Sequence, residues 1–127
     1  MADKKEYLAQ AEENGMIFIS EEVIASIAAS AVREVEGVYG LCTGTSLDLG
    51  NIIGRKNLRK GIRVQFRQQG FEISCNLVVR MGCAVVSVAK AVQETIADEV
   101  MAMTGISPLR VNVNVSGIAV PKTEKMK

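Results

Sequence analysis

Residues 81–105 read MGCAVVSVAKAVQETIADEVMAMTG, and this stretch predicts one long amphipathic helix around which the chain folds. Its apolar residues recur every three or four positions, which is the spacing of one helical face. Gly105 after Thr104 suits a left-handed helix end. From Cys83 to Met103 the helix would be about 30 Å long, at 1.5 Å per residue. Its buried face is expected to comprise Val85, Val88, Val92, Ile96, Val100 and Met103.

Charged residues interrupt this stretch, and they argue for a core helix rather than a membrane span. Lys90, Glu94 and Asp98 fall on a different side from the apolar face. Lys90 and Glu94 stand one turn apart, which predicts a weak ion pair.

A second amphipathic helix is expected over Glu21–Glu36. Ser20 suits the N-cap, two acids occupy the first turn, and Gly37 follows the last turn. Short apolar runs at Met16–Ile19 and Val38–Cys42 predict strands on either side. Residues 1–14 are charged, and we expect a loose helix or a tail there.

Three later segments alternate between apolar and polar residues, as half-buried strands do. They are Gly61–Arg67 and Phe71–Val79, which form an antiparallel hairpin, and Leu109–Ile118. Residues 43–60 are irregular and predict a long loop. The whole pattern predicts an α+β two-layer sandwich, with a mainly antiparallel sheet and two helices on one face. The strand order does not follow from the sequence.

The length of 127 residues fits one domain. We expect a polar N-terminal segment over residues 1–15, a single domain over 16–118 and a disordered tail over 119–127. The first 15 residues contain no apolar signal core, and no secretion or anchoring segment is expected.

The residue types present argue against catalysis. The chain has no histidine, which excludes histidine-based acid–base chemistry and Ser-His-Asp or Cys-His sites. The three cysteines Cys42, Cys75 and Cys83 are not in metal-ligand spacing and suggest buried thiols in a reducing compartment. Cys83 is a candidate for a reactive thiol at a helix start, but no base is visible beside it. No catalytic, cofactor or metal residue is therefore predicted.

Charge is uneven along the chain, although the net charge is only +1. Residues 1–48 carry nine acids and three bases, whereas residues 49–71 carry six bases and no acid. One interpretation is a solvated loop and strand, and the other is a surface that meets an acidic partner, including the acidic N-terminal part of another copy. This candidate basic patch comprises Arg55, Lys56, Arg59, Lys60, Arg63 and Arg67.

Within the patch, IIGRKN at residues 52–57 is similar to the backbone-clamping loop of KH RNA-binding modules. In a KH module the loop joins two helices, whereas here Gly61 leads directly into an alternating strand. A chance match is the preferred interpretation.

Several blocks in order resemble the alkaline-shock-protein family, the Gls-type envelope stress response proteins of Gram-positive bacteria. They are ISEEVIASIAASAVREVEGVYG at residues 19–40, KGIRVQF at 60–66, VAKAVQETIADEVMAMTGI at 88–106 and VNVNVSGI at 111–118. The match covers about residues 16–118. GRKN with the following KG, at residues 54–61, is similar to a branch whose genes often neighbour those of acetyl-CoA carboxylase.

This resemblance implies a cytoplasmic, non-enzymatic protein that forms homo-oligomers and supports cell-envelope homeostasis. It implies attachment at the membrane through a separate anchor protein, without direct insertion, and no cofactor. The first alternative is a regulator of fatty-acid synthesis that acts on acetyl-CoA carboxylase. The second is an RNA-binding module that uses the basic loop 54–60, and an enzyme ranks last.

Overall fold

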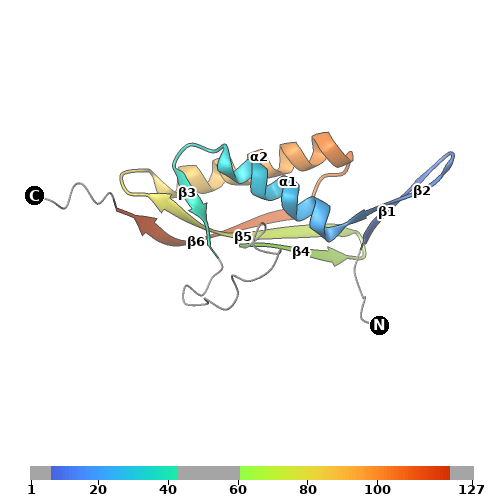
Figure 1. Ribbon diagram of the computed structural model, residues 1–127, viewed down its shortest axis with the longest axis horizontal. Coiled ribbons are helices and arrows are strands. Elements are labelled where there is room, and N and C mark those ends of the chain that lie inside the picture. Colours follow the sequence, from blue (N-terminus) through green and yellow to red (C-terminus); the bar gives the residue numbers. More distant parts are fainter. Residues whose placement is uncertain (1–6, 43–60, 121–127) are drawn as a thin grey trace, which may run out of the picture.

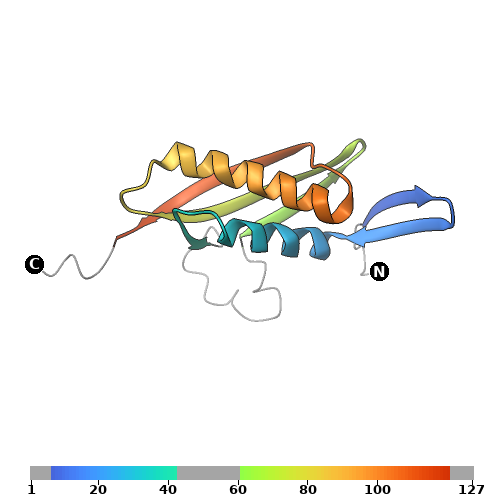
Figure 2. The same cartoon turned by 90° about the horizontal axis from the view of Figure 1, so that it is seen from above.

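The computed structural model describes residues 7–42 and 61–120, and it confirms the predicted α+β sandwich (Figure 1). Two helices lie side by side on one face of a four-stranded sheet (Figure 2), and a separate two-stranded hairpin precedes them. The elements are β1 (Tyr7–Glu12), β2 (Gly15–Ser20), α1 (Glu21–Arg33), β3 (Val38–Leu41), β4 (Ile62–Arg67), β5 (Gly70–Arg80), α2 (Val85–Thr104) and β6 (Arg110–Ala119).

Strand β5 is the centre of the four-stranded sheet. Strands β3 and β4 pair with it antiparallel and share one of its edges, with Val38 opposite Val79 and Ile62 opposite Cys75. Strand β6 pairs with the other edge and runs parallel to β5, with the register shifting between Leu77 and Val78. The β4–β5 hairpin confirms the sequence prediction. The parallel pairing follows from α2, because a helix that crosses back over the sheet returns the chain in the same direction.

The core lies between this sheet and the two helices. The predicted alternation of β5 is confirmed, because all five of its inward residues are buried: Phe71, Ile73, Cys75, Leu77 and Val79. The predicted face of α2 is buried at Val88, Val92, Ile96 and Val100. Met103 was expected on that face but is 67% exposed, because the burial of α2 stops at Val100, one turn earlier.

Helix α1 starts and ends by local hydrogen bonding. The Ser20 hydroxyl accepts a hydrogen bond from the Val23 amide at 3.4 Å, which confirms the predicted N-cap. The helix ends at Arg33 rather than at the predicted Glu36. The reason is that the Glu34 and Val35 amides bond three residues back, to Ala31 and Val32, so the chain tightens out of the α-helix.

The prediction of a loose helix or tail near the N-terminus is wrong for residues 7–12. These residues form β1, which pairs antiparallel with β2 from Tyr7 opposite Ser20 to Glu12 opposite Gly15. The hairpin extends away from the two layers (Figure 2). Its contact with the core includes Leu8 and Ile19, which pack against buried residues. We call this hairpin the arm.

Candidate protein-interaction surfaces

The face of the sheet opposite the helices is polar, and we call it the open face. It follows from strand alternation, because the inward residues of each strand are apolar and their neighbours point the other way. The polar side chains on it include Arg63, Gln65 and Arg67 of β4, Glu72, Ser74 and Asn76 of β5, and Arg110, Asn112 and Asn114 of β6.

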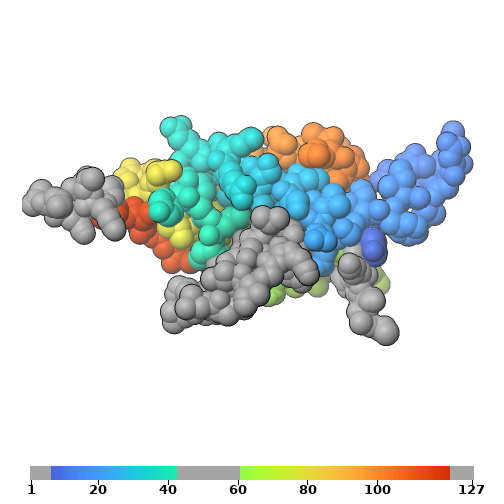
Figure 3. Space-filling model, viewed as in Figure 1, coloured from blue at the N-terminus to red at the C-terminus, as the bar shows by residue number. Residues whose placement is uncertain are grey.

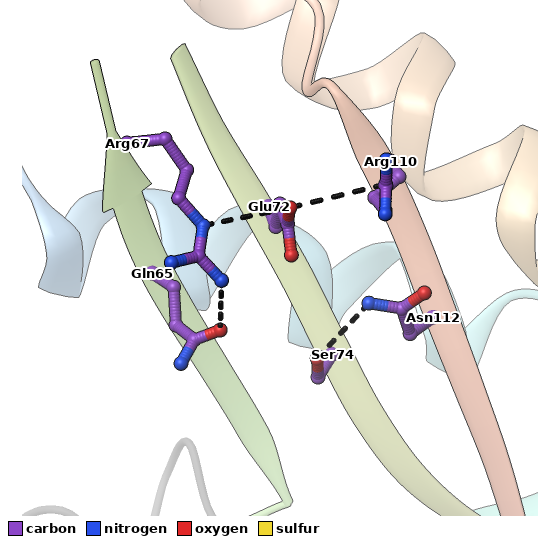
Figure 4. Close-up of polar contacts among 6 residues, drawn as sticks. All are labelled: Gln65, Arg67, Glu72, Ser74, Arg110 and Asn112. Atoms are coloured by element: carbon purple, nitrogen blue, oxygen red, sulfur yellow. Dashed lines mark hydrogen bonds and ion pairs between the residues drawn. The ribbon is translucent and has the colours of Figure 1, made fainter. Parts of the chain in front are cut away.

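One carboxylate on the open face lies between two arginines (Figure 4). The Glu72 Oε2 atom is 3.5 Å from Arg67 Nε and 3.8 Å from Arg110 Nε. The Glu72 side chain is only 15% exposed, whereas the two arginines are 48% and 66% exposed. Arg67 also donates to the Gln65 amide oxygen at 3.2 Å. The result is a line of charges across β4, β5 and β6.

Amide side chains join β5 and β6 further along the same face. The Asn114 Nδ2 atom donates to Asn76 Oδ1 at 2.8 Å, and the Asn112 Nδ2 atom lies 3.5 Å from the Ser74 hydroxyl. These pairs are directly opposite in the parallel register. They leave an uncharged polar surface beside the charged one.

Only part of the predicted basic patch falls within the described residues. Arg63 and Arg67 lie on the open face, and Arg63 makes no ion pair with another described residue. Arg55, Lys56, Arg59 and Lys60 lie outside the described ranges, as do residues 52–57 with the KH-like string.

The structure places Arg110 on the open face with Arg67. The sequence analysis did not predict Arg110 as part of the site. Arg110 is the first residue of the last alternating strand and lies two positions before Asn112. Because alternate residues of a strand share a face, the sequence could have predicted that Arg110 lies on the same face as Asn112. Its place next to Glu72 depends on the parallel pairing with β5. That pairing joins residues far apart in the chain, and the sequence pattern does not specify it.

A polar hollow of about 390 Å³ lies on the open face near the start of β4. A shallow polar hollow suits the side chains of a protein partner better than an apolar ligand, which needs an enclosed apolar pocket. Its lining residues are Gly61, Ile62, Arg63, Gln65, Ser74 and Asn76.

The arm is the second candidate surface, and it exposes a row of apolar side chains on one side. Antiparallel register places the residues of β1 and β2 that face each other on the same side of the hairpin. This side, which we call the arm face, comprises Tyr7, Ala9, Ala11, Met16 and Phe18.

None of the arm face is buried by the described chain. Tyr7 is 48% exposed, Met16 52% and Phe18 61%, and the rings of Tyr7 and Phe18 meet edge to face with centroids 6.3 Å apart. Figure 3 shows the arm standing out from the body of the molecule. A two-stranded hairpin by itself is marginally stable in water, so this arm gains from any surface that covers it.

The cysteines differ in their surroundings. Burial raises the pKa of the Cys75 thiol to about 11, and this thiol is therefore protonated and unreactive at neutral pH. Cys83 is half-buried and was expected to open the long helix. Helix α2 instead begins at Val85, with Ala84 at the N-cap position, so Cys83 stands before the helix.

Two further findings concern residues 7–42 and 61–120. Within these ranges no group of His, Cys, Asp and Glu side chains is placed to hold a metal ion. No helix in them is both long and apolar enough to cross a membrane.

Comparison with known proteins gives relatives that cover most of the chain. The uncharacterized protein YqhY of Bacillus subtilis is 33% identical over 104 residues, which span 82% of this chain and 77% of that protein. The uncharacterized protein YloU of the same organism is 29% identical over 108 residues, spanning 84% of this chain and 90% of that protein. Among solved structures, the copper form of the MamM CTD aligns with a TM-score of 0.47 at 14% identity, over 76% of this chain and 84% of that one.

The family model of the alkaline shock protein 23 family, described as having a cell envelope-related function, matches residues 9–120. This range holds both helices, five whole strands and most of β1. The match confirms the resemblance drawn from the sequence blocks. The chain therefore belongs to the alkaline shock protein 23 family of cell envelope-related proteins.

Proposed function

We propose that this chain is a non-enzymatic interaction protein of the cell envelope that associates with copies of itself. The arm face is the observation that carries this proposal. Contiguous exposed apolar surface marks sites of protein contact, and here it lies on an element that projects from the body. The family description supports the envelope setting and names no reaction.

Charge favours a second copy as the protein that meets the arm. The turn of the arm carries Glu12 and Glu13, both exposed. The open face carries Arg63, Arg67 and Arg110, which outnumber its single carboxylate. An acidic arm tip therefore complements the open face of a neighbouring copy, and this attraction is weakened by salt.

The proposal places the protein in the cytoplasm, held at the membrane by a separate partner protein. The cell envelope-related function of the family supports the association with the membrane. Regulation of acetyl-CoA carboxylase and RNA binding stay predictions. The basic loop 54–60, on which the RNA interpretation depends, lies outside the described ranges.

Sedimentation velocity of the purified chain tests the self-association. We expect the average mass to rise with protein concentration and to fall as salt increases. Phe18→Thr removes the most exposed ring of the arm face and should shift the distribution to smaller species. The matched control is Ile17→Thr, which changes a residue of similar exposure on the other side of the same strand and should behave as the wild type.

Two results would contradict this proposal. A monomer at every concentration and salt would remove self-association altogether. Equal behaviour of Phe18→Thr and the wild type, in an assembly that does form, would remove the arm face from it.

A further inference from the structure

Within residues 7–42 and 61–120, strand β6 leaves one edge of the sheet open. Among the described strands it pairs only with β5, along its whole length of 10 residues from Arg110 to Ala119. The Val111 carbonyl accepts a hydrogen bond from the Gln93 side chain of α2 at 3.0 Å. It therefore lies on the edge away from β5. Because main-chain groups alternate between the two edges of a strand, the N–H and C=O groups of Val113 and Val115 lie on this open edge too.

This edge lacks the features that usually prevent strands from pairing between molecules. Natural edge strands carry lysine, proline or inward-pointing charges, or they are short. From Val111 to Ala119 the strand has no charged residue and no proline. Its one irregularity is the register shift at Ser116, which comes after Val115. The stretch Val111–Val115 is thus a regular edge with strong β-propensity and three outward-facing residues.

We propose that β6 is a homodimer interface, in which the open edges of two copies pair antiparallel about a two-fold axis at Val113. This inference rests on the self-association proposed above and names a contact for it that is distinct from the arm. The axis at Val113 sets Val113 opposite itself, Val111 opposite Val115 of the other copy, and Asn112 opposite Asn114.

This register pairs the outward-facing groups of the regular edge. Val111, Val113 and Val115 of each copy would lie in three directly opposed pairs, which offer about six main-chain hydrogen bonds. The Val111 carbonyl already accepts from Gln93 within its own chain, so about four of these bonds have a free acceptor, close to the lower end of the range of about 10 ± 5 for a typical interface. Valines would meet valines on the helix side of the sheet, and amides would meet amides on the open face.

A second copy fits this edge better than a charged partner does. The stretch Val111–Val115 is uncharged, so two copies meet without repulsion, and an acidic or basic partner gains nothing there. The overlap is that of a weak, reversible interface. With the axis at Val113, residues 110–116 of the two strands lie side by side over about 23 Å, and the sheet and helix layers together are about 20 Å thick. This flank is then about 450 Å² per copy, or about 900 Å² in total, which is the size of a reversible contact between copies.

Helix α2 adds apolar side chains to the same flank. Gln93 reaches β6, and therefore the residues that share its side of the helix also face this way. Val86 and Ala97 lie seven residues before and four residues after Gln93, which places them on that side. Val86 is 67% exposed, which is high for an apolar side chain in the first turn of a core helix.

Disulfide trapping tests the register. In the proposed dimer the two Val113 Cα atoms are about 5.5 Å apart, which suits a disulfide. We expect Val113→Cys to form a covalent dimer under mild oxidation. Val111→Cys is the matched control, because the two copies of that position lie four residues apart along the paired strands, about 13 Å. It should not crosslink with itself, but a mixture of Val111→Cys and Val115→Cys chains should.

A second variant tests the edge without cysteine chemistry. Proline is tolerated in an edge strand where its nitrogen faces outward, so Val113→Pro should keep the β5 pairing but lose hydrogen bonds across the interface. Sedimentation should show this variant weakened in self-association at least tenfold, with its circular dichroism unchanged. If it does not fold, the trapping result still decides.

The outcomes separate this inference from the proposed function. A wild type that associates, whose Val113→Cys form does not crosslink or crosslinks no faster than Val111→Cys, would overturn the β6 interface and leave self-association standing. A wild type that is monomeric throughout would overturn both.

Discussion

The backbone of Gly37 lies against the side chain of Val88: a Cβ atom placed on Gly37 would stand 2.7 Å from Val88 Cγ2 and 3.3 Å from Cys83 Sγ. Gly37 is buried and has a φ of +97°, a conformation that side chains rarely adopt. Gly37 lies where the turn after α1 packs against the first turn of α2. The close approach of these two segments therefore depends on the absence of a side chain at this residue.

Gly37→Ala should destabilise the fold. The added methyl group meets Val88 and requires a strained φ, and together these effects should lower the free energy of unfolding by about 2–4 kcal/mol. Urea denaturation measures the change. Gly40→Ala is the control, because nothing lies within 4 Å of its Cβ position, and it should change stability by less than about 1 kcal/mol. Equal losses in the two variants would contradict the packing described for Gly37.

The Cys75 thiol should make stability depend on pH in alkaline solution. Burial raises its pKa from 9.0 to about 11. Between these values the unfolded chain loses the proton first, so the contribution is complete below pH 9 and is lost as the pH rises through 11. From pH 8 to pH 10 the wild type should lose roughly 1 kcal/mol more than Cys75→Ala does. Urea denaturation at the two pH values checks this, and parallel curves for the two proteins would contradict it.

Glu72 should contribute only a small, salt-dependent part of the free energy of unfolding, although it is the carboxylate between two arginines on the open face. Its two arginine partners are largely exposed, and exposed ion pairs contribute about 0.2–1 kcal/mol each. We expect Glu72→Gln to lower the free energy of unfolding by about 1 kcal/mol at low salt, and by less at high salt. The control is Glu94→Gln. Glu94 is exposed on α2 and, contrary to the sequence prediction, makes no ion pair with Lys90. A loss that is independent of salt would show that Glu72 acts through packing instead.

Truncation to alanine should lower the stability of the fold at one valine of α2 and leave it nearly unchanged at another. Val92 is fully buried, and Val92→Ala should cost about 2 kcal/mol through lost burial and the cavity left behind. Val86 is 67% exposed, and Val86→Ala should leave monomer stability within about 0.5 kcal/mol. Thermal unfolding at a concentration where the chain is monomeric provides the measurement. A large loss at Val86 under those conditions would mean that it packs within its own chain rather than on the flank of β6.

The sequence predicted the elements whose two sides differ most in burial. Helix α2 and the β4–β5 hairpin have one apolar face each, and the period of that face identified both the element and its buried residues. The same reasoning failed for β1. The arm has no buried face of its own over most of its length, so its residues carry no period that distinguishes a strand from a tail. The prediction that Met103 is buried failed for a related reason. The apolar periodicity continues to the end of α2, whereas the burial of the helix against the rest of the core ends at Val100.

The interaction surfaces were only partly visible in the sequence. Arg63 and Arg67 could be placed together because they alternate along one strand. Arg110 could not, since the parallel pairing of β6 with β5 brings it to Glu72 across 38 positions of the chain. The open edge of β6 was equally hidden, because an edge is defined by which strands pair and not by the residues of one strand.

The sequence alone therefore determined the fold class, the ends of most elements and which side of each element faces the core. These properties depend on residues a few positions apart, whose periodicity records burial directly. Only the tertiary structure decided the strand order, the projecting arm, the Arg67–Glu72–Arg110 line and the free edge at Val113. Each of these depends on contacts between segments distant in the chain, and the local pattern of hydrophobic residues is the same whichever partner a strand takes.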